Sequence, residues 1–295
     1  MSIFLDETTR VVVQGLSPTG QGLYHALRNR DYGTQVVAGT NPRRGGETIE
    51  GIPVFATVAE AVAETGATAS FISVPPASAA GAILEAAEAG VALVVCITEF
   101  VPAKDEARTF ARLQRDFPGT RLLGPNCPGL ISPGKANIGI TASDIASPGP
   151  VGLVSRSGTV FYQAIYELTQ KGVGQTTGVG IGGDPVPGTT FIDCLAAFQA
   201  DDATRAVLMI GEIGGAEEER AAEFIAAEMD KPVVAYIVGV TAPPGRKMGH
   251  AGAIVSGSKG TAAAKMAALE AAGAQVARNP SEAAELMAGV VAGLG

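Results

Sequence analysis

The chain has few aromatic residues, with no tryptophan, five tyrosines and ten phenylalanines among 295 residues. Alanine, glycine and valine are abundant instead, which suits helices packed closely on a sheet because small side chains let the elements approach. Since 46% of the residues are hydrophobic and only 17% are charged, the chain is too apolar to be disordered. Its length is sufficient for two domains of ordinary size.

Basic residues are also scarce, with 21 lysines and arginines against 29 acidic residues and a formal net charge of −8. Binding to nucleic acids or to membrane surfaces requires a basic footprint, so neither is an expected partner. Two basic pairs, Arg43 with Arg44 and Arg246 with Lys247, are local exceptions in this acidic protein. Each pair is therefore a candidate anion site.

Long hydrophobic runs are missing. The longest, around residues 89–97, is far shorter than the roughly 20 residues that span a bilayer. The N-terminus also lacks the basic and apolar regions of a signal peptide. Three cysteines, Cys96, Cys127 and Cys194, form no CxxC pair, so a disulfide framework or a zinc site is not expected. We expect a soluble, cytoplasmic protein with no metal site of its own.

Short β-branched runs alternate with alanine-rich segments of helical period, a pattern typical of βαβ units and a parallel sheet. The first half predicts strands at 10–14, 35–39, 69–74, 93–97 and 121–124, and helices at 21–31, 58–65, 77–89 and 104–117. The second half predicts strands at 151–155, 175–181, 206–210, 233–237 and 274–277, and helices at 160–171, 191–200, 217–228, 261–272 and 280–292.

These two series predict two doubly wound α/β domains, 1–129 and 150–295. The connecting segment 130–149 is rich in proline and glycine and is expected to be irregular. Ligands of such sheets bind at the carboxyl ends of the strands, so the residues that follow each strand are the candidate site residues.

A loop with three glycines, residues 14–22, lies between the first predicted strand and the first predicted helix. Glycines there allow a tight turn and bring backbone N–H groups and the helix N-terminus against a phosphate. The same loop could serve only to turn the strand into the helix. A NAD site would place an acidic residue after the next strand, but this chain has Arg43 and Arg44. Two guanidinium groups suit a ribose phosphate, as in CoA or NADP, although they could also be solvated surface side chains.

A second strand-to-helix junction, at 155–159, carries hydroxyl groups and a glycine. Hydroxyls and free N–H groups at a helix N-terminus can hold an anion. Simple capping of the helix by Ser157 or Thr159 explains the same residues equally well.

His250 lies in a long glycine- and proline-rich loop, after the basic pair Arg246 and Lys247. Imidazole is a good phosphoryl acceptor, because one ring nitrogen attacks while a hydrogen bond to the other fixes the tautomer. Glu212, just after a predicted strand, is a candidate partner for that second nitrogen, although it could also be an exposed carboxylate in a turn. The other histidine, His25, lies in an amphipathic helix and is interpreted as structural.

The chain resembles the succinyl-CoA synthetase (succinate–CoA ligase) α-subunit family over nearly its whole length. The matching motifs are GPNCPG at 124–129, VSRSGT at 154–159, VGIGGDP at 179–185, MIGEIGG at 209–215 and the loop 239–254 with GHAG at 249–252. The resemblance implies an N-terminal Rossmann-like CoA-binding domain and a C-terminal flavodoxin-like domain.

The resemblance also implies roles for individual residues. His250 matches the histidine that carries the phosphoryl group, Glu212 matches the carboxylate that orients it, and Tyr162 matches a tyrosine assigned to the substrate. The implied phosphate-holding residues are Ser155, Ser157, Gly158 and Thr159. The implied CoA contacts are Ser17, Thr19, Gly20, Gln21, Arg44, Val74, Pro75, Ile97, Thr98 and Glu99.

By the same resemblance, succinyl-CoA reacts with phosphate, His250 takes the phosphoryl group, and ADP or GDP accepts it with Mg²⁺ on a partner β subunit. The assembly would be an αβ heterodimer or its dimer. Gln163 stands where the family usually has glutamate after the substrate tyrosine, so the small diacid is left open between succinate and malate. Two readings of another class are an NADP-dependent oxidoreductase, suggested by Arg43 and Arg44, and a CoA-binding regulatory protein without catalysis.

Overall fold

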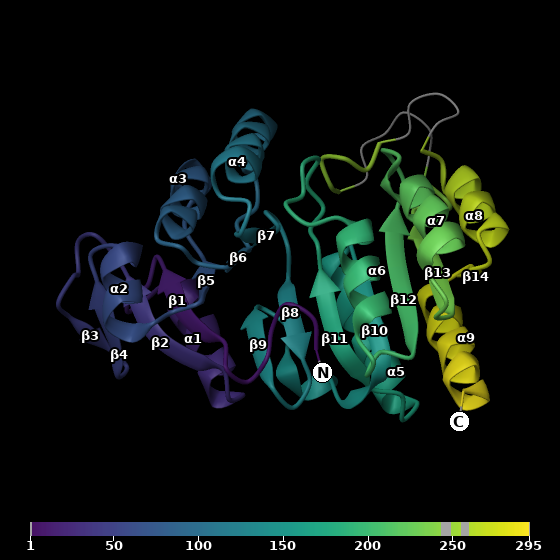
Figure 1. Cartoon of the computed structure of the whole chain (residues 1–295), viewed down its shortest axis with the longest axis horizontal. Helices are drawn as coiled ribbons and strands as arrows, with labels where there is room; N and C mark the ends of the chain where they lie inside the picture. Colours follow the sequence, from purple (N-terminus) through teal and green to yellow (C-terminus); the bar gives the residue numbers. More distant parts are fainter. Residues whose placement is uncertain (1, 243–248, 255–259, 295) are drawn as a thin grey trace.

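A computed structural model describes residues 2–242, 249–254 and 260–294. Within these ranges the chain forms two seven-stranded sheets that lie side by side, each with helices on both faces (Figure 1). The predicted α/β architecture of two doubly wound sheets is therefore confirmed. The proposed anion site at Arg246 and Lys247 lies outside the described residues.

The first sheet has the strand order β3-β4-β2-β1-β5-β6-β7 and is parallel apart from the pair of β3 and β4. Its strands are β1 Arg10–Gln14, β2 Gln35–Thr40, β3 Thr48–Ile49, β4 Ile52–Phe55, β5 Ala69–Ile72, β6 Leu93–Cys96 and β7 Arg121–Leu123. Its helices are α1 Gln21–Asp31, α2 Val58–Thr65, α3 Pro76–Glu88 and α4 Ala103–Asp116. Strand order reverses beside β1, and ligands of such sheets bind at the carboxyl ends of the strands at such a reversal.

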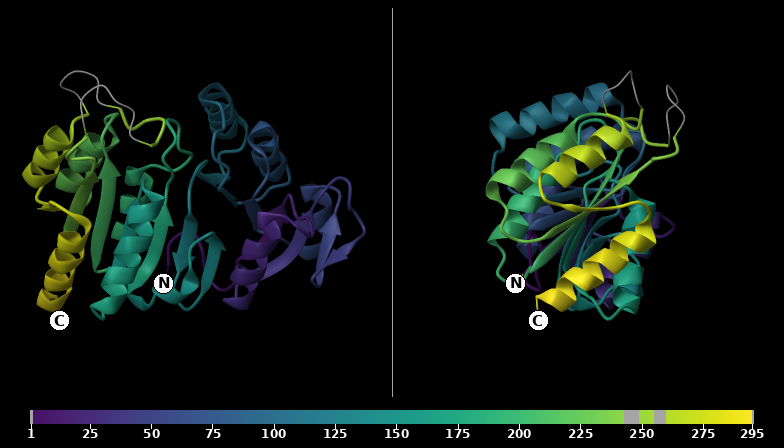
Figure 2. Two further views of the ribbon diagram at one scale, coloured as in Figure 1. Left: turned by 180° about the vertical axis from the view of Figure 1, so that it is seen from behind. Right: turned by 90° about the vertical axis from the view of Figure 1, so that its right-hand side faces the viewer.

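The second sheet has the order β14-β13-β12-β10-β11-β8-β9. Its strands are β8 Gly129–Ser132, β9 Ala136–Gly139, β10 Pro148–Ser155, β11 Gln175–Gly180, β12 Ala206–Glu212, β13 Val233–Val238 and β14 Gln275–Ala277. Its helices are α5 Gly158–Gln170, α6 Phe191–Ala200, α7 Glu217–Glu228, α8 Ala262–Ala271 and α9 Pro280–Gly293. The order β11-β10-β12-β13-β14 is that of flavodoxin-like folds, with the reversal beside β10. Helix α5 packs with α9, whereas α7 packs with α6 and α8 (Figure 2).

The segment 130–149 differs from its predicted irregular form. It contains an antiparallel hairpin of β8 and β9, and β8 pairs antiparallel with β11. All residues of both strands are buried, so they lack the alternation by which a half-exposed strand is recognised. The backbones also approach closely, since a Cβ on Gly129 would lie 2.0 Å from the carbonyl oxygen of Ile138. We therefore propose that the second domain begins near Gly129.

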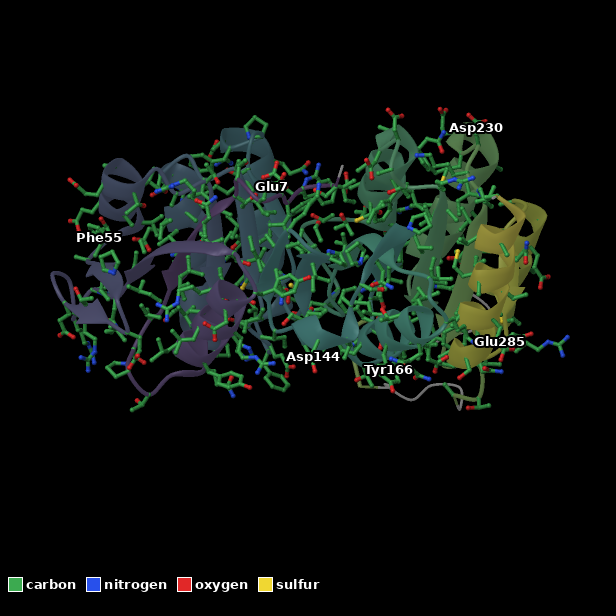
Figure 3. The ribbon with its side chains drawn as sticks, turned by 90° about the horizontal axis from the view of Figure 1, so that it is seen from below. Glu7, Phe55, Asp144, Tyr166, Asp230 and Glu285 are labelled. Atoms are coloured by element: carbon green, nitrogen blue, oxygen red, sulfur yellow. The ribbon has the colours of Figure 1, made fainter. Side chains whose placement is uncertain are left out.

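The short pair β3 and β4 was also not predicted, because two and four residues are too few for a recognisable period. The other predicted strands and helices agree with the structure to within three residues at each end. No described helix has the length and apolar character to cross a membrane. Charged side chains such as Glu7, Asp144, Asp230 and Glu285 lie on the surface (Figure 3).

The two domains are held together by a continuous hydrophobic cluster and by buried hydrogen bonds. Ile3 donates its N–H to Thr177 Oγ1 of the second sheet at 3.2 Å. Thr34 Oγ1 donates to the carbonyl of Asn137 at 2.8 Å and accepts from the Asn137 N–H at 2.9 Å. These contacts join the segments that precede β1 and β2 to strands β11 and β9 of the second sheet.

A pair of buried carboxyl groups, Glu106 of α4 and Asp184 of the loop after β11, lies between the domains. The Glu106 side chain belongs to a residue only 3% exposed. Burial, followed by the neighbouring Asp184, raises the pKa of Glu106 from 4.5 to about 8. At neutral pH Glu106 therefore keeps its proton and is mainly uncharged.

This pKa predicts how stability changes with pH. Between pH 4.5 and 8 the folded protein keeps a proton on Glu106 that the unfolded chain has lost, so stability falls as pH rises through this window. Glu106→Gln removes the titration. We expect this variant to be more stable than the wild type at pH 9, by about 1–3 kcal/mol, and nearly equal to it at pH 5. Urea unfolding at the two pH values tests this, and equal effects of the substitution at both would contradict it.

Candidate functional site

The residues of the second domain that follow β10 and the residues of the first domain that follow β6 meet at one cavity of about 230 Å³. Its lining comes from both domains and consists of Ile97, Glu99, Asn126, Cys127, Pro128, Ile140, Ser157, Gly158, Thr159, Tyr162 and His250. A larger cavity, of about 590 Å³, lies beside α4 and contains none of the predicted site residues. The smaller cavity is therefore the better candidate for chemistry.

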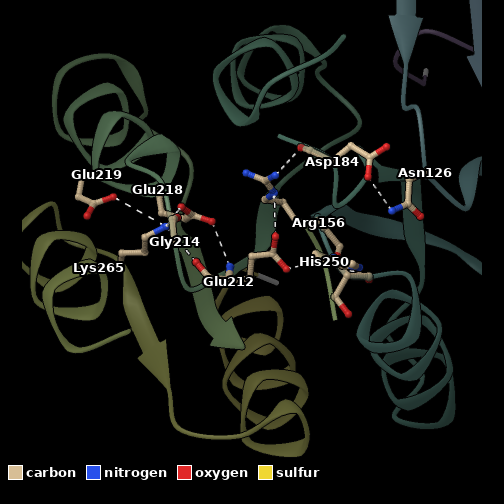
Figure 4. A network of polar contacts seen from close by, with 11 residues as sticks. Asn126, Arg156, Asp184, Glu212, Gly214, Glu218, Glu219, His250 and Lys265 are labelled. Carbon is tan, nitrogen blue, oxygen red and sulfur yellow. Dashed lines mark hydrogen bonds and ion pairs between the residues drawn. The ribbon is translucent and has the colours of Figure 1, made fainter. Parts of the chain in front are cut away.

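His250 and Glu212 form the closest polar contact at this cavity. The Nδ1 atom of His250 lies 2.6 Å from Oε2 of Glu212 (Figure 4). Glu212 is the last residue of β12 and its side chain is 6% exposed, so it is not an exposed carboxylate in a turn. The His250 side chain is 28% exposed, which leaves the ring accessible from the cavity.

The hydrogen bond to Glu212 raises the pKa of His250 above its ordinary value, although partial burial opposes the shift. The carboxylate accepts a hydrogen bond from Nδ1–H of the neutral ring, and this tautomer leaves a lone pair on Nε2. The arrangement can therefore present Nε2 as a nucleophile, and Glu212 can stabilise positive charge on the ring.

Arg156 completes the buried network around Glu212. Its Nε atom lies 3.3 Å from Glu212 Oε1, and its Nη2 donates to the carbonyl of Asp184 at 2.8 Å. Asn126 Nδ2 donates to Asp184 Oδ1 at 2.9 Å, which ties the network to the loop before β8 (Figure 4). The sequence interpretation assigned no role to Arg156, Asp184 or Asn126. The one available signal was a charged residue, Arg156, directly after a strand of apolar residues.

Gly183 sets the position of the imidazole ring. A Cβ atom at Gly183 would lie 2.3 Å from Cγ and Nδ1 of His250, so no side chain fits there. This explains why a glycine follows β11 at the point where the His250 loop crosses it.

Gly183→Ala should displace the ring and break its hydrogen bond with Glu212. We expect the pKa of His250 to fall toward its ordinary value, because that hydrogen bond is the main cause of the rise. Overpacking should also cost about 1–3 kcal/mol of stability. Histidine NMR titration measures the pKa, with Gly119→Ala as the control, since a Cβ at Gly119 meets no atom within 4 Å. An unchanged His250 pKa in Gly183→Ala would show that a Cβ at position 183 does not displace the His250 ring.

The N-terminus of α5 faces the same cavity. Ser157 caps the helix by accepting the N–H of Val160 at 3.3 Å, and Ser155 Oγ accepts the N–H of Ser157 at 3.1 Å. The capping interpretation of Ser157 is therefore confirmed, yet Ser157, Gly158 and Thr159 also line the cavity. The first N–H groups of a helix have no partner inside the helix, so this end remains suited to an anion.

Tyr162 lies one turn into α5 and lines the cavity beside these residues. Burial raises its pKa to about 12. The phenol is therefore neutral at physiological pH and can donate or accept a hydrogen bond.

The residues predicted to contact CoA follow four neighbouring strands of the first sheet. Ser17, Thr19, Gly20 and Gln21 follow β1, Arg44 follows β2, Val74 and Pro75 follow β5, and Ile97, Thr98 and Glu99 follow β6. The structure therefore places all of them at one edge of the sheet.

Contacts between these loops are close. A Cβ on Gly15 would lie 2.7 Å from the carbonyl oxygen of Ser73, and Thr98 Oγ1 donates to the carbonyl of Val74 at 2.8 Å. Of the predicted CoA contacts, Ile97 and Glu99 reach the His250 cavity. Arg44 is half-exposed and pairs with Glu47 at 3.0 Å. His25 lies in α1 with its ring edge against Tyr24, and it does not line this cavity.

Two family models match the chain, a CoA binding domain at residues 6–100 and a CoA-ligase domain at residues 154–275. The succinate–CoA ligase [ADP-forming] subunit alpha of Aquifex aeolicus is 55% identical over 291 residues, covering 99% of this chain and 95% of the relative. Subunit alpha 2 from Archaeoglobus fulgidus is 54% identical over 292 residues, covering 99% and 100%.

Among solved structures, ATP citrate lyase of Methanosaeta concilii in complex with (3S)-citryl-CoA superposes with a TM-score of 0.90 at 27% identity. The match covers 99% of this chain and 51% of that one, so the chain spans about half of that protein's length. Since relatives more than 50% identical match nearly from end to end, the chain belongs to the succinate–CoA ligase α-subunit family.

Proposed function

We propose that this chain is the α subunit of an NDP-forming succinate–CoA ligase, which interconverts succinyl-CoA, phosphate and NDP with succinate, CoA and NTP. His250 carries the phosphoryl group between the two half-reactions. The observation that carries the proposal is the 2.6 Å contact between His250 Nδ1 and a buried Glu212, in a cavity that also contains the N-terminus of α5.

The residues at the edge of the first sheet fit CoA as a substrate. The loop after β1 turns tightly at Gly15, where a Cβ would collide with the β5 loop, so backbone N–H groups can approach a phosphate. Arg44 can exchange its surface partner Glu47 for a ribose phosphate, because exposed ion pairs contribute little stability. Ile97 and Glu99 then connect this edge with the His250 cavity, which is where the thioester reacts.

In the first half-reaction, a phosphate oxygen attacks the thioester carbonyl, the C–S bond breaks, and succinyl phosphate and the CoA thiol are formed. The N-terminus of α5 holds the phosphate, and Tyr162 hydrogen-bonds the acid. Helix N–H groups suit this task, since phosphoryl transfer depends mainly on positioned positive charge.

In the second half-reaction, Nε2 of His250 attacks phosphorus and the P–O bond to succinate breaks. Glu212 holds Nδ1 and stabilises the charge that develops on the ring, while Arg156 holds Glu212. An oxygen of the NDP then takes the phosphoryl group from Nε2. A covalent intermediate divides one difficult transfer into two easier ones.

The nucleotide and Mg²⁺ belong, in this proposal, to a partner β subunit in an αβ heterodimer or its dimer. The relatives are named as ADP-forming α subunits, which favours ADP and a second chain. The acid is proposed to be succinate rather than malate. Gln163, the departure that left the acid open, is exposed, donates to Glu167 at 2.7 Å and does not line the cavity.

The test is thioester formation by the chain co-expressed with its β subunit, with succinate or malate, ATP or GTP, and CoA. We expect succinate to be used at least about tenfold faster than malate, since a polar mismatch in a small site commonly costs this much. Faster reaction with malate would show that malate, rather than succinate, is the acid substrate. Retention on an NADP column but not a CoA column, with no thioester formed by the assembled complex, would contradict the ligase proposal.

A further inference from the structure

Behind Glu212, on the side away from His250, two charged residues lie wholly inside the protein. Lys265 of α8 and Glu218 of α7 form an ion pair in which both side chains are 0% exposed. Complete burial is rare for lysine and glutamate. A buried ion pair generally contributes little more stability than an apolar pair of the same volume, so stability alone does not account for it.

The pair holds both backbone polar groups of Glu212. Glu218 Oε1 accepts the N–H of Glu212 at 3.0 Å, and Lys265 Nζ donates to the carbonyl of Glu212 at 2.9 Å (Figure 4). Glu218 also packs against the strand itself, since a Cβ on Gly211 would lie 2.5 Å from Glu218 Cγ. The last residue of β12 is thus bound from two helices at once.

The same ammonium group reaches the chain that supports His250. Lys265 Nζ donates a hydrogen bond to the carbonyl of Gly214. The backbone of Gly214 in turn packs against the His250 loop, because a Cβ there would lie 2.1 Å from the carbonyl oxygen of Gly252. One side chain therefore connects the residue that orients the imidazole with the loop that carries it.

We propose that Lys265 and Glu218 are positioning residues for phosphoryl transfer at His250. They fix the backbone of Glu212, so that its carboxylate meets Nδ1 of His250 at 2.6 Å and the ring keeps Nε2 toward the cavity. Neither residue lines the cavity, so neither is expected to contact substrate. The inference rests on the proposed phosphohistidine, but its effect on the Glu212–His250 contact is measurable without any substrate.

The principal variant is Lys265→Met, which keeps most of the side-chain volume but leaves two backbone carbonyls unpaired. The matched control is Lys231→Met. Lys231 also donates to two backbone carbonyls, those of Phe198 and Asp201, both at 2.7 Å, and it lies away from the cavity. Glu218→Gln, which keeps an acceptor for the Glu212 N–H, is the milder second variant if Lys265→Met does not assemble with the β subunit.

Two readouts are taken on the assembled complex. The first is the rate of phosphohistidine formation with ATP–Mg²⁺. The second is the pKa of His250, from NMR of a complex in which the histidines of this chain are isotope-labelled and those of the β subunit are not. The chain has two histidines, so His25 serves as an internal reference. A general loss of structure would move both histidine signals, whereas loss of the Glu212 contact should move one.

We expect Lys265→Met to slow phosphorylation about 10- to 100-fold, the usual effect of losing a group that orients an active-site ligand. The pKa of His250 should fall, the signal of His25 should not move, and CoA affinity should be unchanged. Lys231→Met should phosphorylate within about threefold of the wild type. A folded Lys265→Met or Glu218→Gln with the wild-type His250 pKa and rate would overturn the inference. If the wild type is not phosphorylated, the proposed function fails, and the His250 pKa alone still decides the role of Lys265.

Discussion

His250→Asn should abolish net succinate–CoA ligase turnover, lowering kcat by roughly 10⁴-fold or more, as expected when a nucleophile is removed. Asparagine fills much of the same space and can still donate to Glu212, so the cavity should survive. It offers no lone pair to phosphorus, and the phosphoryl group then has no carrier between the two half-reactions. Continuous thioester assay of the assembled complex measures the loss.

CoA binding should remain within about twofold in the same variant, because the predicted CoA contacts belong to the first domain. His25→Asn is the matched control, since it removes the other histidine, which does not line the cavity. Turnover above about 1% of wild type in purified His250→Asn would mean that the phosphoryl group bypasses this residue.

Glu212→Gln should have the next largest effect, a fall of about 10- to 100-fold in the rate of His250 phosphorylation. The amide oxygen can still accept a hydrogen bond from Nδ1–H but carries no charge, so it no longer stabilises the ring as Nε2 attacks. It also leaves the buried guanidinium of Arg156 without its carboxylate, at a cost of roughly 1–3 kcal/mol in stability.

The pH profile distinguishes this electrostatic effect from simple misfolding. Glu212 raises the pKa of His250, so Glu212→Gln should lower it and move the acid limb of the rate profile to lower pH. Glu217→Gln is the control, because Glu217 pairs with Arg220 on the surface of α7, where an ion pair contributes little. A slower rate with an unmoved acid limb would argue that Glu212 acts through the fold alone.

The sequence predicts the parts of this molecule that depend on local pattern. Helix α1, Gln21–Asp31, and strand β1, Arg10–Gln14, occur at the predicted residues because their hydrophobic periods and flanking glycines are local signals. The hairpin of β8 and β9 was missed because its strands are buried on both faces and so have no period.

The partners of the candidate site could be predicted only in part. His250 and Glu212 were paired because one lies in a long glycine-rich loop and the other at the end of a recognisable strand, and their contact is present. Lys265 could not be found in this way. Its alanine-rich helix has no local signal of a buried charged residue, and its partners are about 50 residues away along the chain. The roles of Ser155, Tyr162 and the CoA-contacting residues stay predictions, although Ser155 and the CoA-contacting residues lie at strand ends and Tyr162 lies in the first turns of α5.

The most direct test is intact-mass analysis of the chain, assembled with its β subunit and treated with ATP–Mg²⁺ or GTP–Mg²⁺. We expect the wild type to gain the mass of one phosphoryl group, which acid treatment removes, and His250→Asn to gain none. Absence of an adduct from an assembled wild-type complex with either nucleotide, or an equal adduct on His250→Asn, would contradict the assignment of His250 as the phosphoryl carrier.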